Sequence, residues 1–137
     1  MTAKEYLRKY AAERKDADAI ESEVRELRRR KERLQAVRDD GMPSTRGEVD
    51  QSNVLVKIED LTSRLIRKTC EYIAEWISID ERIDRMENPE ERAVLRYKYL
   101  TGDKVTWDMI ADKMARSKRS AQLIHGSALR NFPMDGL

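Results

Sequence analysis

Residues 106–131 read TWDMIADKMARSKRSAQLIHGSALRN, and this stretch decides how the chain is expected to fold. Thr106 and Ser117 are residue types that cap helix N-termini. Each precedes a short segment with apolar residues at helical spacing, which predicts helices over 107–114 and from 118 to about 131. Two short helices joined by a three-residue turn are the layout of a helix-turn-helix, whose second helix is the recognition helix.

A third short helix is predicted just upstream, from 89 to about 100. Asn88 is a good N-cap, and the proline that follows it suits the first helical position. Residues 101–104, Thr-Gly-Asp-Lys, indicate a short turn. We therefore expect a three-helix domain over 88–132, followed by a tail at 133–137.

Residues 1–87 predict a long antiparallel helical hairpin. Helices are expected over about 2–38 and 52–87, because no Gly or Pro interrupts either segment. The loop between them is expected at 39–51, where Gly, Pro and Ser cluster. The predicted fold class is therefore all-α: a coiled-coil-like hairpin followed by a helix-turn-helix domain.

Apolar residues recur along both long helices at alternating steps of four and three, which is the seam of a coiled coil. Thr2 and Glu5 open the first helix with the spacing of a capping box. The apolar stripe of the second helix is widened by Ile66, Ile73 and Ile77. We therefore expect that helix to pack also against a second copy or the C-terminal domain, and we predict a homodimer. The residues expected in the hairpin or dimer seam are Ile20, Val24, Leu27, Leu34, Ile58, Leu65, Tyr72, Trp76 and Ile83.

The composition excludes several classes of protein. One Cys and one His among 137 residues cannot build a zinc site, an iron–sulfur cluster or a disulfide framework. There is no apolar run of membrane-spanning length, and the charged N-terminus does not resemble a signal peptide. The sequence also lacks a Gly-rich phosphate loop and a supported nucleophile–His pair. We expect a soluble, cytoplasmic protein without enzyme activity, cofactor, metal or small-molecule substrate, in which Cys70 is reduced and buried.

The net charge of +2 hides an uneven distribution. Residues 41–88 carry three more acidic than basic residues, whereas residues 89–137 carry nine basic and six acidic residues. Between Lys113 and Met134 there are five basic residues and no acidic one. Because neutralisation of phosphates provides much of the affinity of DNA-binding proteins, this segment indicates binding to double-stranded DNA.

The C-terminal segment resembles region four of bacterial sigma factors, the domain that reads the −35 promoter element. PEERAVLRYKY at 89–99 is similar to the first helix of that domain, and TWDMIA at 106–111 is similar to its Thr-Leu-x-x-Ile-Gly/Ala step. SKRSAQLIHGSALR at 117–130 is similar to its recognition helix. The similarity runs without a gap and implies a fold that binds promoter DNA.

The whole chain resembles a narrower family, the small sigma-factor-like or ArpU-type transcriptional regulators of prophages in Gram-positive bacteria. The similar features are the Met-Thr-Ala-Lys-Glu start, the Met-Pro in the hairpin loop and the Asn-Pro-Glu before the last domain. The resemblance implies a regulator encoded by a phage or prophage that acts in the host cytoplasm. The sigma regions that bind the −10 element are missing, so the chain is not a complete sigma factor.

Two positions depart from the region-four pattern. Ala115 stands where the turn usually has Gly, and Ala disfavours the positive φ that Gly tolerates. Arg119 and Ser120 stand where sigma factors have an acidic and a basic side chain. We therefore expect the chain to read a sequence other than the usual −35 element.

Base contacts are expected from Lys118, Arg119 and Gln122, at the start of the recognition helix. Arginine to guanine and glutamine to adenine are the natural pairings, and the alternative is that all three are ordinary surface residues. Among the residues expected at phosphates, Ser117 and Ser120 would serve equally as helix caps. Arg130 would serve equally as a favourable charge at the C-terminus of the helix. The residues expected to contact phosphate are Lys113, Arg116, Ser117, Ser120 and Arg130.

Two further residues of the recognition helix stand out. His125 lies one turn beyond Gln122 and is expected to face outward, either as a solvated or locally hydrogen-bonded side chain or as a groove-edge or phosphate contact. Gly126 lies mid-helix, where Gly costs roughly 1 kcal/mol relative to Ala. A close approach of the helix at 89–100 is one reason for a glycine there.

Three functions remain open from the sequence. The first is a DNA-binding transcriptional regulator whose hairpin dimerises or contacts RNA polymerase. The second is a small terminase-like DNA-packaging subunit, which also joins a helix-turn-helix to oligomerising helices. The third is a polymerase-binding module that does not bind DNA. The basic run at 28–33 fits either a phosphate or polymerase contact or a solvated helix face paired with nearby glutamates.

Overall fold

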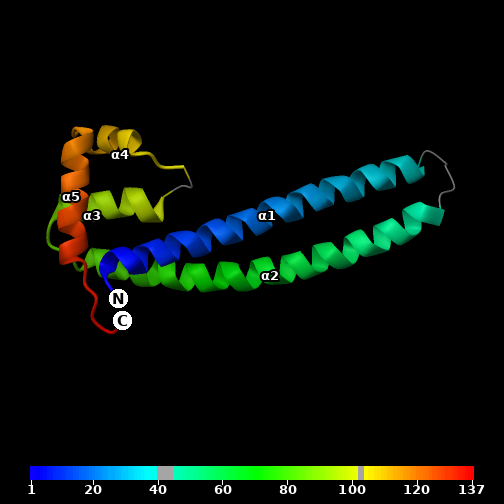
Figure 1. Ribbon diagram of the computed structural model, residues 1–137, viewed down its shortest axis with the longest axis horizontal. Helices are drawn as coiled ribbons and strands as arrows, with labels where there is room; N and C mark the ends of the chain where they lie inside the picture. The colour runs from blue at the N-terminus through cyan, green and yellow to red at the C-terminus, as the bar shows by residue number, and fades with distance from the viewer. Residues whose placement is uncertain (40–44, 102–103) are drawn as a thin grey trace. The chain divides into compact units, whose positions relative to one another are not determined.

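A computed structural model describes residues 1–39, 45–101 and 104–137, and only the backbone for 37–39 and 45–51. These residues form helices and their connections, with no β-strand among them, so the all-α prediction is confirmed (Figure 1). None of the helices described is long and apolar enough to cross a membrane. The elements are α1 (Ala3–Asp39), α2 (Thr45–Asp84), α3 (Pro89–Leu95), the π-helix η1 (Arg96–Leu100), α4 (Trp107–Met114) and α5 (Lys118–Asn131).

Capping residues determine where most of these helices begin. At the start of α1, the Thr2 N–H donates to Glu5 Oε2 over 3.0 Å and the Glu5 N–H donates to Thr2 Oγ1 over 3.2 Å, so the predicted capping box is present. Asn88 caps α3 by accepting from the Glu90 N–H at 2.9 Å. Thr106 likewise caps α4. The predicted short helices therefore have the expected bounds, with the helix from 89 to 100 ending in a π-helical turn.

The second long helix starts earlier than predicted. Its start was expected near Ser52, with 39–51 as a loop, but α2 begins at Thr45 and includes Gly47. The prediction placed Gly47 in the loop because glycine is frequent in loops. A glycine in the first turn of a helix costs only about 1 kcal/mol, and extension of an established helix is cooperative. The remaining loop residues of that prediction, 40–44, lie outside the described part of the chain.

Contacts group the chain into two compact units that differ from the division expected at residue 88. The hairpin unit consists of Arg14–Glu71. The helix-turn-helix unit consists of Tyr72–Leu137 together with Met1–Glu13. The N-terminal end of α1 and the C-terminal end of α2 thus belong to the same unit as the short helices.

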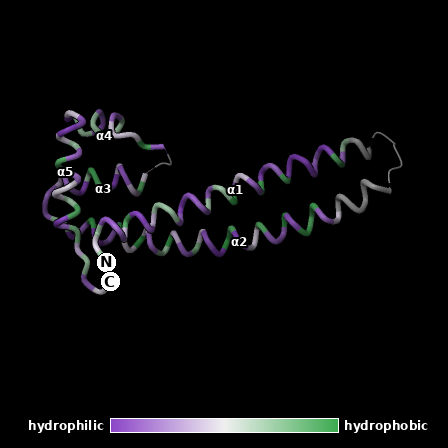
Figure 2. Tube along the Cα trace, in the orientation of Figure 1, coloured by the Kyte–Doolittle hydropathy of each residue, from purple (hydrophilic) through white to green (hydrophobic). Residues whose placement is uncertain are grey.

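The hairpin unit has a narrow core. Ile20 and Val24 of α1 are buried against Leu61 of α2, with Leu27 and Leu65 half-buried at the edges. Figure 2 shows how hydrophilic and hydrophobic positions alternate along α1 and α2. An ion pair between Lys68 Nζ and Asp16 Oδ2, 2.5 Å long, links the two helices across the exposed edge. The seam residues Ile58 and Leu34 are buried and half-buried, respectively.

The helix-turn-helix unit has a broad core that draws on every one of its helices. Figure 1 shows α5 crossing α3 and α4. The seam residues Tyr72 and Trp76 pack at the edge of this core, and Trp76 Nε1 donates to the Leu100 carbonyl over 3.3 Å. The largest fully buried side chains of this unit are Leu7, Tyr10, Ile79, Ile83, Val94, Leu95 and Ile110.

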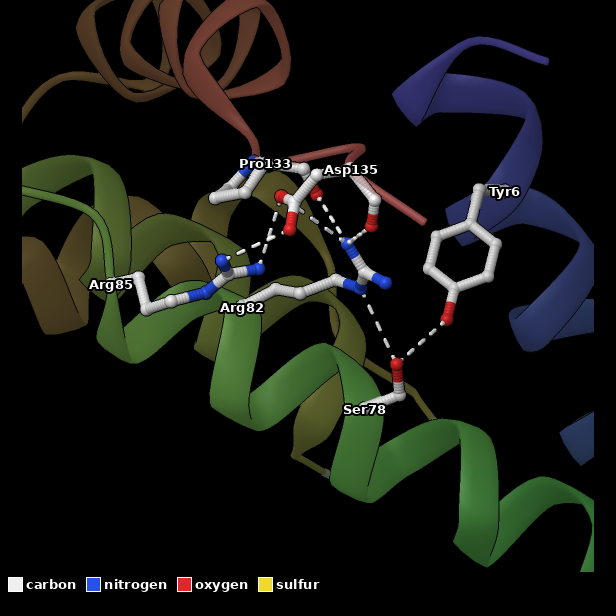
Figure 3. Close-up of polar contacts among 6 residues, drawn as sticks. All are labelled: Tyr6, Ser78, Arg82, Arg85, Pro133 and Asp135. Atoms are coloured by element: carbon white, nitrogen blue, oxygen red, sulfur yellow. Dashed lines mark hydrogen bonds and ion pairs between the residues drawn. The ribbon is translucent and has the colours of Figure 1, made fainter. Parts of the chain in front are cut away.

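The C-terminal tail is held on α2 by two arginines (Figure 3). Arg82 Nη1 donates to the carbonyls of Pro133 and Asp135, over 3.0 and 2.8 Å. Arg85 pairs with the Asp135 carboxylate through both terminal nitrogens, each at 3.2 Å. Hydrogen bonding to Arg85 lowers the pKa of Asp135. The tail predicted at 133–137 is therefore bound to the unit.

A second group of contacts places α1 against the same end of α2. The Tyr6 hydroxyl donates to Glu75 Oε2 over 2.6 Å. It also donates to Ser78 Oγ over 3.4 Å, and Arg82 Nε donates to the same oxygen (Figure 3). Burial, and then the hydrogen bond to Glu75, raise the pKa of Tyr6.

The prediction that Cys70 is buried is wrong, because its side chain lies on an exposed face of α2.

Candidate nucleic-acid interface

The side chains expected to contact bases share the exposed side of α5. Lys118, Arg119 and Gln122 are all exposed. Ser117 begins the helix, and its Oγ accepts from the Ser120 N–H over 3.1 Å. Because the first turn holds no acidic residue, its free N–H groups and its two cations present one positive end to solvent.

Of the two serines expected at phosphates, Ser117 forms the helix cap, and Ser120 is half-buried. The capping role of Ser117 does not exclude a phosphate contact, because a hydroxyl has a second lone pair and a proton to donate. Arg130 is exposed further along α5. It lies eleven residues after Arg119, about three turns and roughly 16 Å along the axis, and thus on nearly the same side of the helix.

The other two expected phosphate contacts already have partners within the unit. The Lys113 ammonium lies 5.4 Å from the centroid of the Tyr97 ring. Arg116 forms an ion pair with Glu90 at the N-terminus of α3, and both side chains are nearly half exposed. An exposed pair of this kind contributes at most about 1 kcal/mol, so exchange of Glu90 for a phosphate would cost little. These contacts therefore hold Lys113 and Arg116 in place while both side chains stay exposed to solvent.

The turn between α4 and α5 has a left-handed residue that is not glycine. Ala115 has φ 54° and ψ 42°. The Arg116 N–H then donates to the Ala111 carbonyl over 3.0 Å, which closes the C-terminus of α4 in the manner of a Schellman motif. Ala rather than Gly thus adopts the left-handed conformation of this turn, at a cost of about 1 kcal/mol.

A buried carboxylate fixes α5 against α3. Glu91 is 5% exposed, and its Oε1 accepts from Ser127 Oγ over 2.6 Å and from Asn131 Nδ2 over 3.0 Å. Its Oε2 is 3.2 Å from the same Asn131 nitrogen. Since a buried carboxylate is costly unless its oxygens are hydrogen-bonded, these contacts orient α5 about its own axis. Local sequence patterns give no signal for Glu91, because its partners lie 36 and 40 residues away in the chain.

His125 does not face outward as expected. Its Nε2 is hydrogen-bonded to the Tyr99 hydroxyl at 2.9 Å, and its ring meets the edge of Trp107 with centroids 5.1 Å apart. Burial, and then the charges of Lys98 and Lys4, lower the pKa of His125 to about 4. Burial raises the pKa of Tyr99 to about 12. The helical period explains the error: His125 is four residues after the buried Ala121 and three before the buried Ala128, so it belongs to the inner side of α5.

Gly126 has no close neighbour in α3. A Cβ built on it would meet only Arg130 Nη1, at 3.9 Å, which is ordinary contact. The close approach to the helix at 89–100 that would account for this glycine is therefore absent. Among the described residues, no group of His, Cys, Asp and Glu is arranged to hold a metal ion.

Residues 44–131 match the protein family described as "Protein of unknown function (DUF1492)". The match spans more than half of the chain, and the chain belongs to this family. It covers α2 and all the short helices, including the exposed face of α5. Neither the curated proteins nor the solved structures provide a match.

Proposed function

We propose that this member of the family is a DNA-binding transcriptional regulator of a phage or other mobile element, acting in the cytoplasm of the bacterial host. The observation that carries the proposal is the exposed face of α5, where Lys118, Arg119 and Gln122 lie together behind a capped N-terminus without an acidic residue. A rigid helix with such an end fits the major groove, where arginine and glutamine make bidentate contacts to guanine and adenine.

Anchoring of the inner side of α5 also supports this proposal. Glu91 and His125 join it to α3, η1 and α4, so its outer side has a defined orientation. The proposed phosphate contacts are Lys113, Arg116, Ser117, Ser120 and Arg130. Such contacts position the helix, and base contacts provide specificity.

The hairpin is the proposed site of dimerisation or polymerase contact. Its seam is closed within the chain, so the seam does not require a second copy. Side chains on other faces of α2 are free of such cover: Val56 and Ile66 in the hairpin unit are 63% and 60% exposed. Exposed apolar side chains at several turns of one helix support contact with a second protein surface.

Selection of bound sequences from a random DNA pool, at stated salt, tests DNA binding directly. We expect one enriched motif. A Lys118→Ala/Arg119→Ala variant should bind that motif at least about tenfold more weakly, since each bidentate base contact contributes about 1–3 kcal/mol. A Lys9→Ala/Lys15→Ala variant removes the same charge from exposed positions of α1 outside the basic run at 28–33 and serves as the matched control. Equal binding by wild type and the α5 variant would contradict the proposed face.

Light scattering separates the proposal from its alternatives. A monomer or dimer fits a regulator, whereas a ring of eight or more subunits fits a packaging protein. Co-purification with RNA polymerase that resists salt, together with an empty selection, fits a polymerase-binding module instead.

A further inference from the structure

The outer side of α5 carries one large apolar side chain. Leu123 is 66% exposed, whereas Ile124 and Leu129 pack against the core. A single exposed leucine is ordinary on a protein surface. This one lies a turn after Arg119 and next to Gln122 in the chain, on the exposed side of the helix and at the edge of its cationic face.

Gly126 adjoins Leu123 on the next turn of the same side. Relative to Ala, Gly126 lowers the helix-formation equilibrium constant roughly fivefold. The neighbouring side chains nevertheless leave room for a Cβ at this position. The apolar side chain of Leu123 therefore projects from the helix next to Gly126, which has no side chain. Arg119 and Arg130 bracket both of them along the helix.

The charge of this surface identifies its partner. Lys118, Arg119 and Arg130 suit a polyanion, and α5 contains no acidic residue. In the major groove, the apolar feature presented by base pairs is the C5 methyl group of thymine. A leucine next to the residues proposed to read guanine and adenine is placed to contact such a methyl group.

We propose that Leu123 reads the 5-methyl group of a thymine in the major groove, and that Gly126 leaves the space for α5 to approach the DNA closely enough. This inference rests on the proposed DNA-binding function and adds to it a specificity-determining residue. It also accounts for a glycine that the fold itself does not need.

Replacement of thymine by deoxyuridine tests the methyl contact, because it removes the methyl group and leaves the hydrogen-bonding edge. Each thymine of the selected motif is replaced in turn. We expect one replacement to weaken wild-type binding about fourfold, as burial of one methyl-sized group predicts. Leu123→Ala should lose a similar factor on thymine DNA and then be insensitive to that replacement. Met109→Ala, which removes another exposed apolar side chain of the unit, should keep the wild-type response.

Gly126→Ala tests the proposed approach through effects of opposite sign. The variant should melt a few degrees higher, since Ala is the better helix former. It should nevertheless bind the selected motif about tenfold more weakly. Circular dichroism on each variant checks that the fold is retained.

The outcomes separate the two proposals. An empty selection would overturn both the DNA-binding function and this inference. A selected motif that wild type binds equally with thymine or uracil at every position would overturn the inference alone. Unchanged affinity of Gly126→Ala would overturn the role of Gly126.

Discussion

The hairpin unit and the helix-turn-helix unit contain helices of the same chain, yet different interactions stabilise them. In the hairpin unit, a narrow row around Ile20, Val24 and Leu61 is buried, and ion pairs such as Lys68–Asp16 lie at the surface. In the helix-turn-helix unit, the core joins residues from all its helices, and Glu91 is buried with its hydrogen bonds satisfied. The first arrangement buries few side chains and leaves apolar ones such as Val56 and Ile66 exposed. The second orients one helix precisely enough to present its outer side.

The largest expected difference between the units lies in their cores. Leu95 and Leu61 are equally buried, at 0% and 1% exposure. Leu95→Ala should lower the free energy of unfolding by about 4 kcal/mol, because a broad core cannot collapse around the cavity. Leu61→Ala should cost about 2 kcal/mol, because two helices with few neighbours can close the gap. Urea unfolding measures both, and equal losses would remove the contrast between the two cores.

The next difference concerns carboxylates. Glu91→Ala should cost about 2 kcal/mol, since it leaves Ser127 and Asn131 without their acceptor in a buried site. Asp16→Ala removes a carboxylate of an exposed ion pair in the hairpin unit and should cost less than about 1 kcal/mol. The same urea titrations apply. A loss from Asp16→Ala as large as that from Glu91→Ala would show that surface pairs hold the hairpin.

Acid should weaken the helix-turn-helix unit through His125. Its pKa falls from 6.5 in the unfolded chain to about 4 in the folded one, so the unfolded chain binds the proton more readily between these values. The resulting stability is complete above pH 6.5 and is lost as pH falls toward 4. Allowing for solvent screening of this half-buried ring, we expect a loss of about 1 kcal/mol between pH 7 and 5.

The matched variant for that prediction is His125→Gln, which has no proton to gain in this range. The difference in unfolding free energy between wild type and variant should change with pH only below about 6.5. A constant difference from pH 7 to 4 would show that His125 does not titrate as its surroundings require.

The smallest expected effect sharpens the description of the turn. Ala115→Gly should raise the free energy of unfolding by about 0.5–1 kcal/mol, because Gly accepts the left-handed conformation at this exposed position. Ala12→Gly, at an exposed right-handed position of α1, should have the opposite sign and cost about 1 kcal/mol. Thermal melts of the two variants should shift in opposite directions. A destabilising Ala115→Gly would mean that the turn is not strained.

Local sequence signals predicted the short helices well. Asn88, Thr106 and Ser117 each accept the backbone hydrogen bonds that their positions before an apolar segment indicated. The same signals placed Lys118, Arg119 and Gln122 on one exposed side, because the helical period alone determines which residues share a face. The start of α2 was misplaced, since the cost of Gly47 is small beside the cooperative gain of a longer helix.

By itself, the sequence determined the helices, their caps, the three-residue turn and the basic character of the last segment. Each of these depends on neighbours within about four residues. Only the tertiary structure decided that Glu91 is buried between Ser127 and Asn131, that His125 meets Tyr99 and Trp107, and that Met1–Glu13 packs with the C-terminal helices. These features depend on which distant elements meet, and burial and hydrogen bonding acquire their energies only when they do.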